Sequence, residues 1–583
     1  MNTTVNTLKK RIAVSQQQHP ADFILRNAQV ADVFSLGWTT ADVVVADGMI
    51  VAIDSTGSFE ALEEMDAKGR YVVPGLIDGH IHIESSMLTP VAFGDVLLPH
   101  GVTTVVTDPH EIANVSGMAG IQFMLNDAEN SPMDIFVMLP SSVPSTSFEN
   151  AGAVLEASDL QPLLSHPSVL GLAEVMDYPS VLSGGDKMLT KLAMTQDAGL
   201  RIDGHGAGLQ NDEIRGYRAA GIQTDHECVT ADEARNRVAQ GMYVLIREGS
   251  AAKNLHDLLP AVTQHNARRF LFCTDDKHLD ELVSEGSIDH AIRLAIAAGM
   301  APLQAIQIAT LNASECYGLS QKGALAPGFE ADFILLDDLD SFAIAAVWKK
   351  GKKVAENGAM VVVSSSSIQC PENILHSVHL PELTEESLSI PFLKGTTANI
   401  MKIIPNQLVT QHIIETVDVV NGAFVANIEH DQLKLAVIER HHLKHSIGLG
   451  IVKGFGLKTG AVATTIAHDS HNVIVLGAND ADMLVAVKAL QDMQGGLVVV
   501  NEGRVIASLS LPVAGLMTQV PLDEAVESLA GLHKALHSIH PTLDFHLFLT
   551  LSFLSLPVIP ALKLTDTGLF DVVSFKHIPI EKE

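Results

Sequence analysis

Short apolar runs alternate with stretches of helical periodicity between residues 71 and 324. Eight such runs are spaced along this segment, at residues 71–77, 102–106, 134–139, 169–173, 200–203, 222–224, 242–246 and 269–273. Strands alternating with helices over roughly 250 residues are typical of a parallel (β/α)₈ barrel of the TIM type. An open, doubly wound sheet has the same alternation, so the pattern alone leaves two α/β architectures.

Polar residues suited to metal binding or catalysis follow directly after these runs. They are His80, His82, His110, Glu174, His205, His226 and Asp275. In a barrel the carboxyl ends of all the strands meet at one face, so these side chains can share a site. In an open sheet the outer strands lie too far apart for that. The distribution of polar residues therefore predicts the barrel, over residues 71–324.

The segments on either side of the barrel predict a small β domain formed by residues 1–70 together with 325–363. Apolar runs at 42–46 and 49–53 flank Asp47-Gly48, a hairpin turn signal, and a similar run stands at 331–336. Residues 364–394, which begin with the serine run 364–367 and continue rich in proline and glutamate, are predicted to be a linker. Residues 395–583 are predicted to form a C-terminal α/β domain, with strands at 433–438 and 473–476 and a helix at 478–493.

Composition narrows the class of protein. A chain of 583 residues is too long for one core, and its net charge of −31 argues against a nucleic-acid partner. Its four cysteines include no C-x-x-C pair, which fits a reducing compartment. The first twenty residues lack the apolar core of a signal peptide. The apolar segment 545–562 is interrupted by Pro557 and Pro560, which favours buried strands over a membrane span. We therefore expect a cytoplasmic protein with no membrane partner.

His80 and His82 begin the candidate chemistry. Side chains two residues apart on an extended chain point the same way, so the two imidazoles converge. With the other donors they form a candidate set for two divalent metal ions, made up of His80, His82, Glu174, His205, His226 and Asp275. A bridging carboxylate, Glu174, would let two cations share a hydroxide, the nucleophile of a hydrolysis.

Three of these residues are predicted to be catalytic. Asp275 would move the proton, while Glu174 and His226 complete the set. Spacing alone does not separate Asp275 from Asp276 as the ligand. Taken singly, His205 between glycines has an alternative, less favoured interpretation as a turn residue without a role. Arg247 and Glu248, after the seventh run, read equally as a structural ion pair.

The motif P-G-L-I-D-G-H-I-H around His80 resembles the opening motif of the amidohydrolase superfamily. Three longer motifs, I-E-S-S-M-L-T-P, T-D-P-H-E-I-A-N-V and I-R-E-G-S-A-A-K-N, are similar to the bacterial adenine deaminase family within it. The resemblance implies hydrolysis of adenine to hypoxanthine and ammonia, with two divalent ions, Mn²⁺ or Fe²⁺, as cofactors. It also implies that Glu174 replaces the carbamylated lysine that related enzymes use.

A purine base is thus the expected partner, and its recognition needs polar groups matched to the ring edge. The candidates are His110, Glu111 and Ser141 at the barrel mouth, and His468 and His471 in H-D-S-H-N of the C-terminal domain, a loop predicted to fold over that mouth. Glu111 reads equally as a helix-start carboxylate, and H-D-S-H-N as a polar turn. We also expect a homo-oligomer, a dimer.

Two other functions compete with this one. An amidohydrolase acting on a cyclic amide or a related heterocycle would want a lysine near position 174, where this chain has glutamate. A barrel that serves only binding or assembly would be expected to lack metal ligands, whereas this chain keeps all six.

Overall fold

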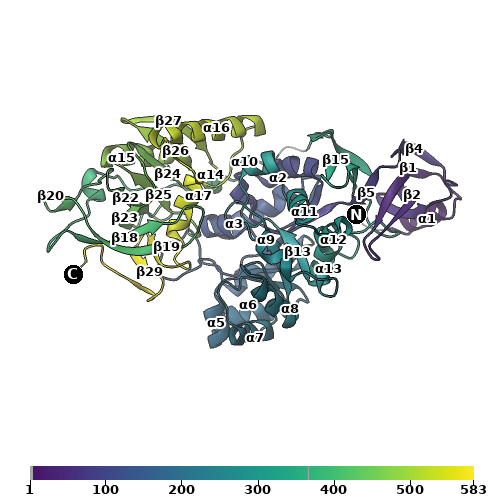
Figure 1. Cartoon of the computed structure of the whole chain (residues 1–583), viewed down its shortest axis with the longest axis horizontal. Coiled ribbons are helices and arrows are strands. Elements are labelled where there is room, and N and C mark those ends of the chain that lie inside the picture. The colour runs from purple at the N-terminus through teal and green to yellow at the C-terminus, as the bar shows by residue number, and fades with distance from the viewer. Residues whose placement is uncertain (1–3, 365–366, 583) are drawn as a thin grey trace.

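The computed structural model describes residues 4–364 and 367–582, so the predicted serine run lies partly outside the described residues. Figure 1 shows three parts along the long axis of the molecule. The C-terminal part, green to yellow, lies at one end, the barrel lies in the middle, and the purple N-terminal strands lie at the other end. The predicted α/β architecture with a central barrel is confirmed.

The barrel has eight parallel strands, which form a five-stranded and a three-stranded sheet. They are β6 (Leu76–Ile81), β7 (Val102–Thr107), β8 (Asp134–Leu139), β9 (Val169–Val175), β10 (Arg201–Gly204), β11 (Thr224–Asp225), β12 (Tyr243–Arg247) and β13 (Phe270–Cys273). Backbone hydrogen bonds join the two sheets at both seams. The amide of Gln223 donates to Ile202 O at 2.9 Å, and the amide of Asp275 donates to His80 O at 3.0 Å. The sheet is therefore closed.

Helices surround these strands. They are α2 (Pro90–Leu97), α3 (His110–Ala128), α4 (Ala157–Leu160), α5 (Tyr178–Ser183), α6 (Asp186–Asp197), α7 (Asn211–Ala219), α8 (Ala231–Ala239), α9 (Leu255–Leu258), α10 (Leu279–Glu285), α11 (Ile288–Ala297), α12 (Pro302–Ala309) and α13 (Leu311–Tyr317). α11 shows why they pack. Its buried residues Ile288, Ala291, Ile292 and Ala295 recur at helical spacing and turn one apolar stripe to the core.

The first predicted strand, 71–77, divides into two. β5 (Tyr71–Pro74) belongs to the small sheet, and β6 begins the barrel at Leu76. Gly75 lies at the junction, where an added Cβ would come within 2.3 Å of Thr103 Oγ1. The backbone passes too close to its neighbour for any larger residue. The prediction that His80 lies beyond the strand is wrong, because β6 extends through it to Ile81.

The small domain is a nine-stranded sheet built from both flanks of the barrel, with α1 (Val5–Ser15) beside it. Its strands are β1 (Ala21–Asp32), β2 (Gly37–Ala46), β3 (Met49–Asp54), β4 (Ala61–Asp66), β5, β14 (Phe333–Asp338), β15 (Ala343–Lys349), β16 (Lys352–Glu356) and β17 (Ala359–Met360). β5 lies between β1 and β14, so the chain leaves this sheet, forms the barrel, and returns to the neighbouring strand.

The C-terminal part contains an eight-stranded, mostly antiparallel sheet in the order β19-β18-β23-β22-β25-β24-β26-β27. Its strands are β18 (Thr397–Ile403), β19 (Thr410–Thr416), β22 (Leu433–Ile438), β23 (Ile447–Lys453), β24 (Ala461–Thr464), β25 (Val473–Gly477), β26 (Gly496–Asn501) and β27 (Arg504–Ser510). In β25, Val473 and Val475 join the cluster of α15 (Asp480–Asp492), whereas Ile474 and Leu476 join that of α16 (Leu522–Ile539). The alternation of side chains along a strand thus places one helix on each face. Two short sheets complete this part, β20 (Val419–Val420) with β21 (Ala423–Phe424), and β28 (Leu562–Thr565) with β29 (Gly568–Asp571) and β30 (Lys576–His577).

Two stretches differ from what their composition suggests. The predicted linker contains α14 (Glu372–Leu375), and Ile374, Val378 and Leu388 are buried in the cores. The apolar segment 545–562 was expected to form strands, yet half of it is helical, with α17 (Leu547–Ser552) followed by a short 3₁₀ turn, and β28 begins only at Leu562. Its apolar residues pack on several sides, which a helix allows. Within residues 4–364 and 367–582, no helix is long and apolar enough to cross a membrane.

A buried ion cluster fastens the small domain to the amino-terminal end of the barrel. Asp332 Oδ2 accepts from Lys349 Nζ at 2.5 Å and from Lys322 Nζ at 3.2 Å, and both lysines also bind Asp134 at the start of β8. Both lysine side chains are less than one-tenth exposed. Removing one member would leave charge uncompensated away from water.

We therefore predict that Asp332→Asn lowers the free energy of unfolding by about 3 kcal/mol or more. Asp337→Asn is the matched control, because Asp337 pairs with Arg70 at 2.8 Å on the surface, 58% exposed. That change should cost about 1 kcal/mol at most. Denaturant unfolding of both variants makes the comparison, and equal effects would contradict a special role for the buried cluster.

Candidate metal centre

Closure of the barrel brings the first and last strands of the candidate site together. The backbone of Asp275 pairs with both His80 and His82, since the His82 amide donates to Asp275 O at 3.1 Å. Asp275 Oδ1 lies 3.2 Å from His80 Nε2 and 3.0 Å from His82 Nε2. The two histidines thus point the same way, as their spacing predicts, and meet the aspartate that follows β13.

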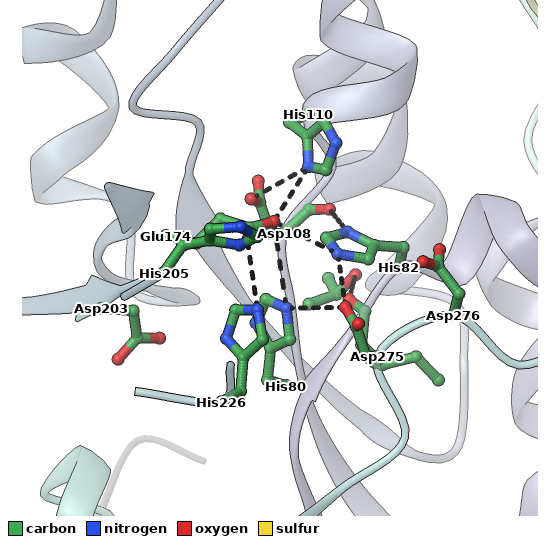
Figure 2. Close-up of polar contacts among 12 residues, drawn as sticks. His80, His82, Asp108, His110, Glu174, Asp203, His205, His226, Asp275 and Asp276 are labelled. Atoms are coloured by element: carbon green, nitrogen blue, oxygen red, sulfur yellow. Dashed lines mark hydrogen bonds and ion pairs between the residues drawn. The ribbon is translucent and has the colours of Figure 1, made fainter. Parts of the chain in front are cut away.

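Glu174, at the end of β9, lies between two groups of histidines (Figure 2). Its Oε1 is 3.3 Å from His82 Nε2 and 4.0 Å from His80 Nε2. Its Oε2 is 2.7 Å from His205 Nδ1 and 3.3 Å from His226 Nε2. One carboxylate therefore faces donors on both sides, as a bridging ligand would.

The six predicted ligands are buried together, with only the His205 side chain reaching 22% exposure. Burial alone would raise the pKa of Glu174, but the neighbouring imidazoles of His205, His226 and His82 outweigh it and hold that pKa well below its usual range. For Asp275, burial is likewise outweighed, chiefly by the charge of Arg247, so its pKa is also well below the usual value. Both carboxylates are therefore held in the anionic form that binds cations.

The donor set fits a divalent cation. His82 Nδ1 lies 3.0 Å from the carbonyl of Asp108, which can only accept, so Nδ1 carries a proton and Nε2 is the ring atom that faces the two carboxylates. Among the described residues, Nε2 of His80 and Nε2 of His226 have no hydrogen-bond partner although both are buried. Donors of this kind without partners are typical of metal ligands.

Arg247 completes the surroundings together with Asp108 and Glu227, two residues that the sequence pattern did not single out. Arg247 Nη1 donates to Asp275 Oδ2 at 2.8 Å and also binds Glu227, so its ion pair is not with Glu248. Asp108 Oδ2 lies 3.1 Å from His110 Nδ1, and that His110 nitrogen lies 3.5 Å from Glu174. Asp108 lies two residues before His110, and Glu227 directly follows His226, and this proximity in the sequence was the signal available.

The neighbouring carboxylate, Asp276, faces away from the histidines. Its Oδ1 accepts from Ser85 Oγ at 2.5 Å, and the same hydroxyl lies 3.2 Å from Glu111 Oε1. Asp275, not Asp276, is thus the aspartate that contacts His80 and His82, and Figure 2 shows their dashed contacts reaching Asp275. Ser141, predicted to contact substrate, instead donates to the carbonyl of Glu174 at 2.6 Å and holds that residue in place.

The H-D-S-H-N loop of the C-terminal domain, residues 468–472 between β24 and β25, reaches the barrel mouth. His468 Nδ1 lies 3.4 Å from Glu111 Oε1, and Asp469 Oδ1 lies 3.8 Å from His110 Nε2. The ring of His468 stacks on Phe553, with centroids 4.3 Å apart. The loop therefore covers the site, as expected, and adds Asp469, which sequence reasoning passed over.

Arg440 holds this loop from behind. Its guanidinium is fully buried and donates to the carbonyls of His471, Ser377 and Ala514, the last at 2.9 Å. All three acceptors are main-chain carbonyls, and burial lowers the pKa of Arg440 to about 9. Hydrogen bonds from Arg440 thus fix the part of the site wall that the C-terminal domain contributes.

Comparison with known proteins agrees with this geometry. Residues 71–354 match the amidohydrolase family, the class of hydrolase that the closed barrel and its histidine-carboxylate cluster define. Residues 407–576 match the adenine deaminase C-terminal domain.

Curated relatives match over almost the whole chain. One from Lysinibacillus sphaericus, named adenine deaminase, is 63% identical and aligns over 100% of both chains. Others of that name, from Geobacillus kaustophilus and Halalkalibacterium halodurans, are 54% and 50% identical over 99% and 98% of each chain. The chain belongs to the adenine deaminase family, so the resemblance found in its motifs is confirmed.

A barrel loop beside the site is clamped by the C-terminal domain. The amide nitrogen Nδ2 of Asn150 donates to Asp566 at 2.6 Å, and Lys444 Nζ donates to Asn150 Oδ1 at 2.7 Å. The adjacent Glu149 is buried and accepts from Thr146 Oγ1 at 2.6 Å. Burial, with the charges of Asp469 and Asp566, raises the pKa of Glu149 to about 8, so this carboxyl is protonated at neutral pH.

The proton on Glu149 makes the stability of the folded protein depend on pH. The pKa of Glu149 is about 8 in the folded protein and near 4.5 in the unfolded chain. Its contribution to the free energy of unfolding is therefore complete below about pH 4.5 and is lost as the pH rises through 8. We predict that Glu149→Gln removes this loss and gains on the order of 2–4 kcal/mol over the native protein between pH 5 and pH 9. Unfolding measured at both pH values tests it, with exposed Glu129→Gln as the control. Parallel pH profiles for native and Glu149→Gln protein would refute it.

Proposed function

We propose that this protein is an adenine deaminase that hydrolyses adenine to hypoxanthine and ammonia. The observation that carries the proposal is the full-length match, at 63% identity, to a relative named adenine deaminase. The buried cluster at the carboxyl end of the barrel supports it, because hydrolysis at carbon 6 needs an activated water and a proton donor for a poor amine leaving group.

We further propose that two divalent ions, Mn²⁺ or Fe²⁺, bind there. The first would be held by His80, His82 and Asp275, the second by His205 and His226, with Glu174 between them. The split of short contacts between the two oxygens of Glu174 supports this division. When bound, such ions lower the pKa of a shared water toward neutrality and supply the nucleophile. In this proposal Glu174 and His226 contribute to catalysis only by binding the metal ions.

Asp275 is the residue that would move the proton. It would accept a proton from the attacking water and return it to the departing amine. Arg247, 2.8 Å from Oδ2, fixes the carboxylate and leaves Oδ1 directed at the histidines. An aspartate held this way undergoes no reorganisation between the two transfers.

His110, Glu111, His468 and His471 are proposed to contact the purine. They are buried around the same mouth, and some of their polar atoms, such as Glu111 Oε2, have no partner within the described chain. Ser141 is better explained as a positioning residue, since its hydroxyl is engaged with the backbone of Glu174.

The rival function, hydrolysis of a cyclic amide with a carbamylated lysine, finds little support. Position 174 is glutamate, and Lys191, which is buried nearby, donates to the carbonyl of Ser141 at 2.7 Å. We also keep two expectations as proposals, that the protein is cytoplasmic and that it forms a homodimer, the latter measurable by light scattering.

Ammonia release from adenine tests the function. We predict release by protein loaded with Mn²⁺ or Fe²⁺, loss of activity after chelation, and recovery when the metal is restored. Metal analysis should find two ions per chain, and Glu174→Gln should weaken the binding of at least one, because a neutral amide bridges two cations poorly. Undiminished activity in rigorously metal-free protein would rule out the metal-dependent mechanism.

A comparison of two neighbouring aspartates tests the proton transfer. Asp275→Asn keeps an oxygen that can coordinate but cannot carry the proton, so turnover should fall roughly 10²–10⁴-fold or more while metal content changes less. Asp276→Asn is the matched control and should be milder, because Asp276 bonds Ser85 rather than the histidines. Equal losses in the two variants, or a reversal of their order, would assign the transfer elsewhere, with Glu111 and His226 next to test.

A further inference from the structure

The His471 imidazole is held from three directions, and one of its atoms is left without a partner. Its amide donates to Ala467 O at 2.7 Å, its carbonyl accepts from Arg440, and its ring Nδ1 accepts from the amide of Ala467 at 3.3 Å. Nε2 is fully buried, and no described group lies within hydrogen-bond distance of it. A buried polar atom of a rigidly held ring needs a partner that the chain itself does not supply.

The hydrogen bond at Nδ1 determines what Nε2 offers. Burial, together with the charges of His468 and Arg440, keeps the pKa of His471 well below its usual value, so the ring is neutral. A neutral imidazole has one proton, and because Nδ1 accepts from the Ala467 amide, that proton is on Nε2. His471 therefore presents an N–H donor. This tautomer does not suit a metal ion, although Glu111, His468 and His471 stand close enough to surround one.

Glu111 presents the complementary group. Its Oε1 is engaged by Ser85 Oγ at 3.2 Å and faces His468 Nδ1 at 3.4 Å, while Oε2 is buried without a described partner. Ligand atoms of Glu111, His468 and His471 all lie within 4.8 Å of one another. An unpartnered carboxyl oxygen from the barrel and an unpartnered ring nitrogen from the C-terminal domain thus belong to the same cluster.

Adenine presents an acceptor beside a donor on three edges, and the edge formed by N3 and N9–H is the one that does not include the departing 6-amino group. If carbon 6 lies against Asp275 and the histidines, as the proposed function requires, the ring atoms farthest from the reaction are N3, an acceptor, and N9–H, a donor. Adjacent donors and acceptors on a planar ring pair best with a donor and an acceptor held at similar spacing.

We propose that His471 Nε2–H donates to N3 and that Glu111 Oε2 accepts from N9–H. This inference rests on the proposed function and deepens it, because it makes these two residues determinants of specificity. A nucleoside has no N9–H and carries a sugar at that atom, so the pair selects the free base. A site that buries polar groups for a particular edge rejects ligands that leave them unpaired.

Purine analogues test the pairing atom by atom. Native protein should deaminate 3-deazaadenine and 9-methyladenine with kcat/KM about 10–100-fold below adenine, whereas 7-deazaadenine, which keeps both N3 and N9–H, should lose less. In His471→Phe, activity on adenine falls but the difference between adenine and 3-deazaadenine should disappear. In Glu111→Met, the difference between adenine and 9-methyladenine should disappear instead. If each variant loses discrimination against a different analogue, the results identify which side chain contacts which atom of the purine.

His540→Phe is the matched control, because His540 is a buried histidine of the same domain that also has an unpartnered ring nitrogen, yet it packs beside Gly456. It should leave every analogue ratio unchanged. Metal content should also be unaltered in His471→Phe, and a lost ion would overturn the proposal in favour of a coordinating role. Variants that lower all analogues equally would likewise overturn it.

Binding separates failure of this inference from failure of the proposed function. Should native, metal-loaded protein release no ammonia from adenine, the proposed reaction is wrong, and calorimetry with purine, 3-deazapurine and 9-methylpurine still examines the edge contacts. Tighter binding of purine than of both analogues, abolished separately in the two variants, would support the pairing. Equal affinity for all three ligands would overturn it.

Discussion

The backbone pairing between the first and last barrel strands is the constraint on which the site depends. Asp275 exchanges hydrogen bonds with His80 and His82, and this same contact closes the sheet. Because this register pairs the backbone of Asp275 with that of His80 and His82, it brings Asp275 rather than Asp276 to the histidines. Asp275 itself takes a left-handed conformation, with φ of 58°, at the point where the chain turns out of the strand. The contact that closes the barrel therefore also brings the residues of the site together.

Charge balance is the second constraint, since the cluster is buried. Two anionic carboxylates, Glu174 and Asp275, are buried among histidines, with Arg247 as the permanent cation beside Asp275. Buried charge is tolerable only when compensated and hydrogen-bonded. The C-terminal domain adds to this enclosure, because residues 468–472 cover the mouth and Arg440 fixes them. A site shared by two domains is sensitive to changes in either.

Much of this arrangement could be predicted because it depends on periodicity. Histidines at strand ends, Glu174 at the end of β9 and Asp275 after β13 follow from where apolar runs stop. The predictions that failed concern features that depend on tertiary contacts. Gly75 splits one apolar run between two sheets because Thr103 approaches it, and no local pattern signals that contact. The apolar tail was predicted as strands because helix and strand share short apolar runs. Arg247 finds Glu227 rather than Glu248, a partner from another loop that only the folded barrel brings near.

The position of β5 between β1 and β14 has a consequence for how the protein is made on the ribosome. β5 ends at Pro74, whereas β14 begins at Phe333, so the nascent N-terminal sheet keeps an unpaired edge until the whole barrel has been translated. At typical synthesis rates that interval lasts roughly ten to fifty seconds. An open edge strand invites pairing with other chains for as long as it stays uncovered. The nascent chain is therefore most exposed to misassembly before its last barrel helix has emerged, and a chaperone that shields the edge during translation would act in this window.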